Sequence, residues 1–157
     1  MAVKTNVMRI LDSAKIIYKT YDYSKSSAVS GKDVAMYLGQ DPNSVFKTLV
    51  TQAKSREYYV FMIPVSCELD LKKAAKAVNE KALEMIPQKD LLKVTGYIHG
   101  GCSPIGMKKC FKLTVHQSAE KAENIIFSAG KIGYQVELSP SELKKIISFE
   151  YADLILH

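Results

Sequence analysis

Glycine, serine, cysteine and basic residues gather in one segment near the middle of the chain, residues 95–109, which reads TGYIHGGCSPIGMKK. Four glycines and a proline interrupt regular structure there, and glycine leaves main-chain N–H groups unshielded by a Cβ atom. Such backbone can lie directly against a ligand. The composition therefore predicts the wall of a binding site, although a plain glycine-rich connector has the same signature.

The loop offers backbone donors that suit acyl chemistry. Ester cleavage and acyl transfer need N–H groups aimed at the carbonyl oxygen on which negative charge develops. Gly100 and Gly101 are the expected donors, because neither carries a side chain that would keep a substrate away from its amide.

Two side chains of the same loop are alternative nucleophiles. Ser103 could act with His99 or His116 as its base, but the chain lacks a G-x-S-x-G elbow, and a serine before proline is commonly a turn residue. Cys102 could attack as a thiolate, or it could simply fill the loop as a small apolar side chain.

A lysine interrupts the first strongly β-forming run of the chain, VFKTLV at residues 45–50. The two-residue period of a strand puts Lys47 on the same face as Val45 and Leu49. Its ammonium either reaches water at the rim of the sheet or projects into a cleft that takes an anionic or polar ligand. The spacing leaves both interpretations open.

A second glycine turn, residues 128–133, joins two predicted strands. It could bring Ser128 and Lys131 towards the same cleft, although hairpins often carry glycine for backbone reasons alone.

Lysines elsewhere in the chain are candidates for phosphate contacts if they share a face, namely Lys72, Lys73, Lys76, Lys108 and Lys109. Helical lysines are more commonly a solvated surface. Histidine, cysteine and acidic residues show no metal-ligand spacing, so we expect neither a metal nor another cofactor.

Length, composition and charge limit the class of protein. The chain has 157 residues, of which 47% are hydrophobic, which suits a single domain over residues 1–157. Apolar runs stay well below the roughly 20 residues that span a bilayer, and three cysteines without a C-x-x-C pair favour reduced thiols. We therefore expect a soluble cytoplasmic protein with no membrane contact, and the net charge of +6 would attract a polyanion such as nucleic acid.

Periodicity and capping signals predict short helices and strands in irregular alternation. This order favours a mixed α+β fold, with helices packed around a mixed sheet, over a doubly wound parallel sheet. The predicted helices cover residues 4–14, 30–39, 70–76, 88–94 and a final segment from 139 onwards, and the predicted strands cover residues 18–23, 45–51, 58–64, 112–115, 125–127 and 134–138.

Four ordered motifs together resemble the YbaK/EbsC family of aminoacyl-tRNA editing deacylases. They resemble the branch that acts on Cys-tRNA(Pro) more closely than the alanine-editing branch or the inserted editing domain of bacterial prolyl-tRNA synthetases. The motifs are FKTL at 46–49, LDLKKAA at 69–75, TGY at 95–97 with GGCSP at 100–104, and SAGKIG at 128–133.

The resemblance implies a barrel-like β-sheet flanked by short helices and a pocket that removes a wrongly attached amino acid from the 3′ end of tRNA(Pro). Prolyl-tRNA synthetase is the implied candidate partner. Lys47 stands where the family has its essential lysine, and Gly100, beside Gly101 in the glycine loop, where it has a functional glycine. The remaining implied substrate-binding residues are Tyr23, Ser103, Pro104, Ser128, Gly130 and Gln135.

The family further implies that the thiol of the mischarged cysteine attacks its own ester, so that no protein nucleophile is required. Three departures could shift the accepted amino acid or weaken tRNA contact: Gln135 replaces an aspartate of some relatives, Ile132 an arginine, and Cys110 a basic residue. Deacylation of Ala-tRNA(Pro) or of another small aminoacyl-tRNA remains an alternative. A non-catalytic module that binds tRNA or a synthetase is another.

Overall fold

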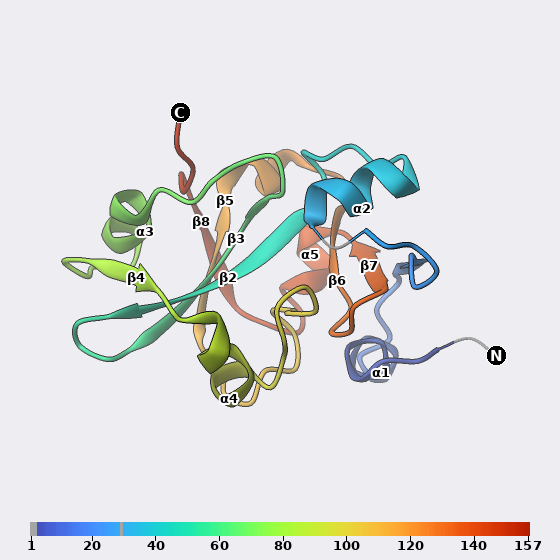
Figure 1. The fold of residues 1–157 in the computed structure, drawn as a ribbon, viewed down its shortest axis with the longest axis horizontal. Helices are drawn as coiled ribbons and strands as arrows, with labels where there is room; N and C mark the ends of the chain where they lie inside the picture. Colours follow the sequence, from blue (N-terminus) through green and yellow to red (C-terminus); the bar gives the residue numbers. More distant parts are fainter. Residues whose placement is uncertain (1–2, 29) are drawn as a thin grey trace.

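The two β-rich runs of the sequence form the centre of the larger of two sheets (Figure 1). The computed structural model describes residues 3–28 and 30–157. Strands β2 (Phe46–Ala53) and β3 (Tyr58–Pro64) pair antiparallel, with Lys47 opposite Ile63. The sheet order is β4-β2-β3-β5-β8, with β4 (Leu83–Met85) at one edge and β5 (Lys112–His116) and β8 (Phe149–Ala152) adding parallel strands at the other.

The smaller sheet has the order β1-β7-β6, and its strands pair antiparallel. They are β1 (Lys19–Asp22), β6 (Ile125–Ser128) and β7 (Tyr134–Leu138). A β-bridge between Val45 and Ile126 joins the two sheets just before β2 begins, and the Ile126 N–H donates to the Ser44 carbonyl at 2.9 Å. Lys47 therefore lies two residues from the junction of the sheets.

The helices surround these sheets, and side-chain caps begin most of them. Ser30 accepts a hydrogen bond from the Asp33 N–H, and Asp70 accepts from the Lys72 and Lys73 N–H groups, which satisfies donors that a first helical turn leaves free. Thr5 and Ser139 cap in the same way. The helices are α1 (Asn6–Ser13), α2 (Gly31–Leu38), α3 (Leu71–Ala77), α4 (Leu91–Thr95) and α5 (Pro140–Leu143), with 3₁₀ turns η1 (Gln88–Asp90) and η2 (Gln117–Lys121).

Alternation along the smaller sheet gives its two faces different environments. Side chains of the odd-numbered β6 residues and the even-numbered β7 residues, such as Phe127 and Val136, pack into the main core together with α1. Ile126 faces the other way and packs with Ala35 of α2. Since successive residues of a strand point to opposite faces, Ser128 and Gln135 lie on the α2 side.

The mixed α+β architecture expected from the sequence is confirmed, and each predicted strand and each of the first four predicted helices has a counterpart within a few residues. Two strands, β4 and β8, were not predicted. Both are short, and β8 pairs in parallel with β5, far away in the sequence. The final helix was predicted too long: α5 ends at Leu143, and Ile146 and Ile147 pack against the core from the turns that follow.

Within residues 3–28 and 30–157, none of the helices has the length and apolar character needed to span a bilayer.

The two glycine-rich segments of the sequence pack directly against each other. A Cβ atom on Gly101 would lie 3.1 Å from the Ile132 nitrogen, and one on Gly130 would lie 3.0 Å from both the Tyr97 ring and the Val7 side chain. Main-chain contact this close needs residues without side chains. The glycines therefore hold residues 96–106 against residues 128–133.

We predict that Gly130→Ala destabilises the protein more than Gly39→Ala. Both glycines have positive φ, +89° and +68°, but a Cβ on Gly39 would meet no atom within 4 Å. Backbone strain alone should lower the free energy of unfolding by about 1 kcal/mol at Gly39. Strain and overpacking together should lower it by about 2–4 kcal/mol at Gly130. Urea denaturation measures both variants, and equal losses would contradict the tight packing of the two turns.

Candidate functional site

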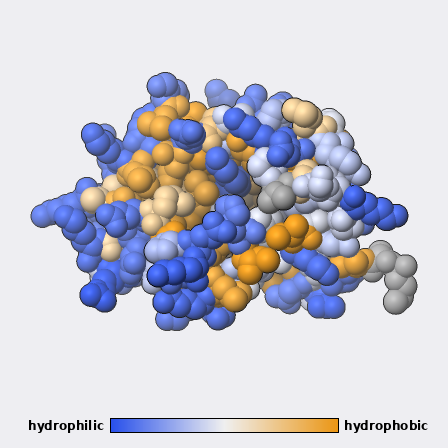
Figure 2. Space-filling view, viewed as in Figure 1, coloured by the Kyte–Doolittle hydropathy of each residue, from blue (hydrophilic) through white to orange (hydrophobic). Residues whose placement is uncertain are grey.

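A cavity of about 410 Å³ opens where the two sheets, α2 and the glycine loop meet. In Figure 2 it lies in the middle of the face, between α2 above and α4 below. Five residues expected at the site line it, from four separate parts of the chain: Tyr23, Lys47, Gly100, Ser128 and Gln135. The other lining residues are Ser30, Gly31, Lys32, Val34, Val45, Phe46, Thr48, Leu49, Val65, Leu91, His99 and Cys102.

Lys47 contributes a half-buried ammonium group to this cavity. Burial lowers the pKa of Lys47 below its usual value, Glu68 partly opposes this, and the nearby Lys32 lowers the pKa further. Among the described residues, none forms an ion pair or hydrogen bond with the Lys47 Nζ atom. A partly desolvated cation without a partner can bind a phosphate, a carboxylate or a polar oxygen of a ligand.

The glycine loop brings main-chain N–H groups to the cavity, and that of Gly100 is the expected donor. Gly100 lines the cavity, and its N–H donates to no acceptor within the described parts of the chain. Gly101 differs, because its N–H donates to the Ile98 carbonyl at 3.0 Å and the residue packs on the backbone of the second glycine turn. Of the two expected donors, Gly100 and not Gly101 therefore has an amide available to polarise a bound carbonyl.

Ser103, Pro104 and Gly130 lie outside the lining of this cavity. Ser103 is completely buried, and its Oγ accepts a hydrogen bond from the Ile105 N–H. Pro104 instead lines a separate cavity of about 160 Å³ on another side of the glycine loop. The Gly130 N–H donates to Ser128 Oγ at 3.1 Å, so Gly130 acts on the cavity through Ser128.

The two nucleophile alternatives find no support in this geometry. His116 lies on β5, where its Nδ1 accepts from the Leu154 N–H at 3.2 Å, so it cannot serve as a base for the buried Ser103. Cys102 lines the cavity, but burial raises the pKa of its thiol to about 12. A thiol with so high a pKa is protonated at neutral pH and is a poor nucleophile.

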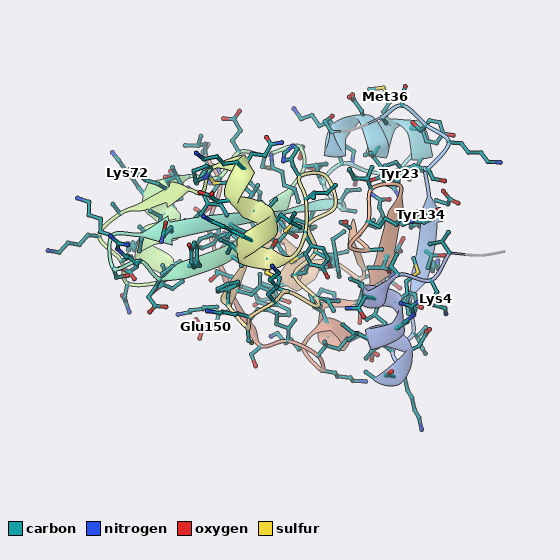
Figure 3. The ribbon with its side chains drawn as sticks, turned by 60° about the horizontal axis from the view of Figure 1, so that its bottom comes forward. Lys4, Tyr23, Met36, Lys72, Tyr134 and Glu150 are labelled. Carbon is teal, nitrogen blue, oxygen red and sulfur yellow. The ribbon has the colours of Figure 1, made fainter. Side chains whose placement is uncertain are left out.

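The smaller sheet forms the opposite wall of the cavity. Gln135 on β7 pairs with Tyr21 on β1 and with Ser128 on β6, so these side chains share one face. Tyr23 follows β1, and its N–H donates to the Gly133 carbonyl at 2.7 Å. Figure 3 shows Tyr23 close to the end of β1, beneath α2. Gln135 Oε1 accepts a hydrogen bond from Gln40 Nε2 at 2.9 Å.

Several residues at the cavity were not predicted from the sequence. Lys32, at the start of α2, adds a cation to the lining. Thr48 lines the cavity from β2, and its buried Oγ1 has no hydrogen-bond partner in the described structure. The SGK sequence at residues 30–32 was a usable signal, because it brings a lysine to the first turn of a capped helix.

The lysines of α3 lie far from the cavity. Figure 1 shows α3 at the end of the molecule opposite the smaller sheet, and Figure 3 shows Lys72 at the end opposite Tyr23. Lys73 is engaged in an ion pair with Asp153 at 2.9 Å. The lysines of α3 therefore add no positive charge beside Lys47 in the cavity.

The chemistry available in the cavity is polarisation and positioning. Lys47, Lys32 and the Gly100 amide offer positive charge and donors, while Leu49, Leu91 and Val65 supply apolar walls. Within residues 3–28 and 30–157, no Asp or Glu lines the cavity, and no group of three His, Cys, Asp or Glu residues could hold a metal ion. Such a site suits an anionic or ester-bearing ligand.

Comparison with known proteins gives this cavity a family context. A curated protein of Enterococcus faecalis, named "Putative Cys-tRNA(Pro)/Cys-tRNA(Cys) deacylase EbsC", is 44% identical over 152 residues, which cover 96% of this chain and 93% of that protein.

Two solved structures share the fold at low sequence identity. One is described as a "putative trans-editing enzyme for prolyl tRNA synthetase" and superposes with a TM-score of 0.83 at 21% identity, covering 96% of this chain and 95% of its own. Another, described only as a hypothetical protein, superposes with a TM-score of 0.85 at 18% identity, covering 94% and 97%.

The sequence model of the aminoacyl-tRNA editing domain matches residues 25–146, a range that contains Lys47, the glycine loop, Ser128 and Gln135. With the match covering most of the chain and the relative so similar over nearly its full length, this protein belongs to the family of aminoacyl-tRNA editing domains, the trans-editing deacylases.

Proposed function

We propose that this protein, acting as a single domain, removes cysteine from mischarged Cys-tRNA(Pro). The observation that carries the proposal is that one cavity is lined by both Lys47 and Gly100, whose ammonium and amide N–H have no partner among the described residues. A 44% identical relative whose name includes Cys-tRNA(Pro) supports the choice of substrate.

Lys47 anchors the charged end of the substrate in this proposal. Its ammonium binds a phosphate or ribose oxygen of the terminal adenosine, and the Gly100 N–H donates to the ester carbonyl oxygen. Lysine serves here as an anchor and not as a base, because an ammonium with a pKa normally about 10.4 stays protonated at neutral pH unless burial lowers that pKa strongly.

The nucleophile in this proposal is the thiol of the substrate. Its sulfur attacks the carbonyl carbon of its own ester, the carbon–oxygen bond to the ribose breaks, and the thiol proton ends on the ribose oxygen. Water then opens the resulting four-membered thiolactone to give free cysteine. The buried, protonated Cys102 and the fully buried Ser103 fit a site in which the protein positions groups and supplies no nucleophile.

We predict that Lys47→Ala lowers the rate of Cys-tRNA(Pro) deacylation by on the order of 100-fold or more, because anchoring and transition-state charge stabilisation are lost together. Cys102→Ala should keep most of the activity. Lys54→Ala, which removes an exposed lysine outside the cavity lining, is the matched control. Single-turnover release of labelled cysteine measures all three, and thermal melting checks the fold.

A similar loss in Lys47→Ala and Cys102→Ala would indicate a cysteine enzyme and contradict the proposal. Turnover at the background rate by the unchanged protein would instead indicate a non-catalytic module that binds tRNA.

The pH dependence provides a separate test of the anchor. Because burial lowers the pKa of Lys47, its ammonium loses the proton at a lower pH than an exposed lysine would. We expect KM to rise as the pH approaches that lowered pKa from below. In Lys47→Arg the charge persists, since the guanidinium has a pKa above about 12, so KM should stay flat over the same range. A KM rise of equal size in both proteins would exclude Lys47 as its cause.

Deacylation of Ala-tRNA(Pro) is the second candidate function, and the position of His99 favours it. This exposed imidazole lines the cavity, where it could activate water against an ester that has no thiol of its own.

A panel of Cys-, Ala- and Ser-tRNA(Pro), run with and without prolyl-tRNA synthetase, separates the two functions. We expect rapid release of cysteine and slow release of alanine and serine, with the synthetase increasing selectivity for tRNA(Pro). Rapid alanine release that His99→Asn abolishes would establish the water mechanism instead, and rapid serine release would also contradict a need for the thiol.

A further inference from the structure

Gln135 is a buried polar residue at the inner wall of the cavity. Its exposed fraction is 5%, and it lies between Tyr21 and Ser128 in the middle of the smaller sheet. A buried amide that reaches a cavity is costly unless its donors and acceptors find partners. The hydrogen bonds of this side chain therefore show what it offers to a ligand.

Gln40 fixes the orientation of the Gln135 amide. The Gln40 N–H donates to the Ala35 carbonyl and the Gly39 N–H to the Met36 carbonyl, which is the hydrogen-bond pattern of a Schellman motif at the end of α2. With its backbone held in this way, Gln40 donates through Nε2 to Gln135 Oε1 at 2.9 Å. The short link between helix and sheet uses the acceptor of Gln135 and leaves its donor group free.

The opposite amide orientation is less favourable. Gln40 Oε1 is fully buried and has no partner among the described residues. If both amides were reversed, the Nε2 group of Gln40 would occupy that buried position with two unsatisfied donors in place of one unsatisfied acceptor. The arrangement in the structure therefore has the lower free energy of the two. It directs the Gln135 NH₂ group to the cavity.

The Gln135 NH₂ group lacks an acceptor within residues 3–28 and 30–157. The ester carbonyl already has a donor in Gly100, which lies on a different wall of the cavity. The remaining acceptor that distinguishes a cysteinyl group from an alanyl group is its sulfur, which accepts strongly once it ionises. A neutral N–H donor stabilises a thiolate. A carboxylate at this position would instead repel the thiolate and attract the α-ammonium group of the substrate.

We propose that Gln135 is a specificity-determining residue whose Nε2 group donates to the sulfur of the cysteinyl group, and that Gln40 is the positioning residue that aims it. This inference rests on the proposed function and adds to it the means by which the cavity favours a thiol over a methyl group. It also assigns a task to the glutamine that departs from the aspartate of some relatives.

Other titratable groups line the same cavity and influence the substrate thiol. They are Lys32 on α2, Lys47 on β2, His99 and Cys102 in the glycine loop, and Tyr23 after β1. All five are unchanged in the variants below. Their effect on the pKa of the thiol is therefore common to every protein compared, and differences report on the Gln40–Gln135 pair.

The test uses Gln135→Met and Gln40→Met, which keep side-chain length and remove the amides, with the exposed Gln117→Met as matched control. Single-turnover rates of cysteine release are measured against pH. In the unchanged protein the rate should rise with ionisation of the substrate thiol, which begins below its usual pKa of about 8.5. Gln135→Met should slow the reaction about ten- to a hundredfold at neutral pH, as expected for a lost hydrogen bond to a charged group.

In Gln135→Met the rate of cysteine release should also begin to rise at a pH about one to two units higher. This shift is the ten- to hundredfold slowing expressed as a difference in the pKa of the substrate thiol. Gln40→Met should shift the rise in the same direction by less, because Gln135 remains but is free to rotate. Gln117→Met should behave as the unchanged protein.

Binding provides a readout that needs no turnover. The probes are adenosines carrying cysteine or alanine through a 3′-amide, measured at a pH of about 9, where the thiol is mostly ionised. Gln135→Met should weaken binding of the cysteinyl probe about tenfold or more and leave the alanyl probe within about twofold.

The outcomes separate this inference from the proposed function. Normal cysteine release with an unmoved pH profile in Gln135→Met overturns the role of Gln135 and leaves the proposed function standing. Equal weakening of both probes also overturns it, since that result indicates a general structural effect. Failure of the unchanged protein to release cysteine, together with equal affinity for the two probes, overturns both.

Discussion

The contact between the two sheets determines whether this protein has a site at all. Val45 and Ile126 form the bridge that joins them, and the close packing of Gly101 on the backbone of residues 131–132 holds the two glycine turns together. These contacts bring Lys47 and Gly100 within reach of the smaller sheet. Both contacts are made by main-chain atoms, which cannot move aside as a side chain can. Any side chain at Gly101 would therefore push the two glycine turns apart.

Some polar groups at or near the cavity are buried without the hydrogen-bond partners that buried polar groups usually have. Lys47 is half-buried, and its pKa is lowered by burial. Thr48 Oγ1 and Gln40 Oε1 are buried without partners in the described parts of the structure. Groups of this kind cost stability, and Lys47 and Thr48 both belong to the residues that line the cavity. The well-packed core beneath, which includes Phe127 and Val136, carries the stability that offsets this cost.

Prediction from the sequence succeeded where the signal was local. Ser30, Asp70 and Ser139 cap helices through their own side chains, and the period-2 pattern of β2 placed Lys47 on a strand. It failed for β4 and β8, which are the two edge strands of the larger sheet and join it by pairing with β2 and β5. The glycine loop was identified as a site wall, yet Gly101 proved to be a packing residue whose N–H is engaged with Ile98.

The sequence by itself determined the chemical inventory: a lysine on a strand, two glycine-rich segments, few candidate nucleophiles, and motifs specific enough to indicate an editing domain. Only the tertiary structure decided which of these groups share a cavity, that Ser103 and Cys102 are buried, and that Gln40 holds Gln135 across 95 residues of sequence. The physical reason is the range of the interactions. Capping and alternation act between near neighbours, whereas sheet junctions and buried amide contacts join segments whose proximity no local pattern encodes.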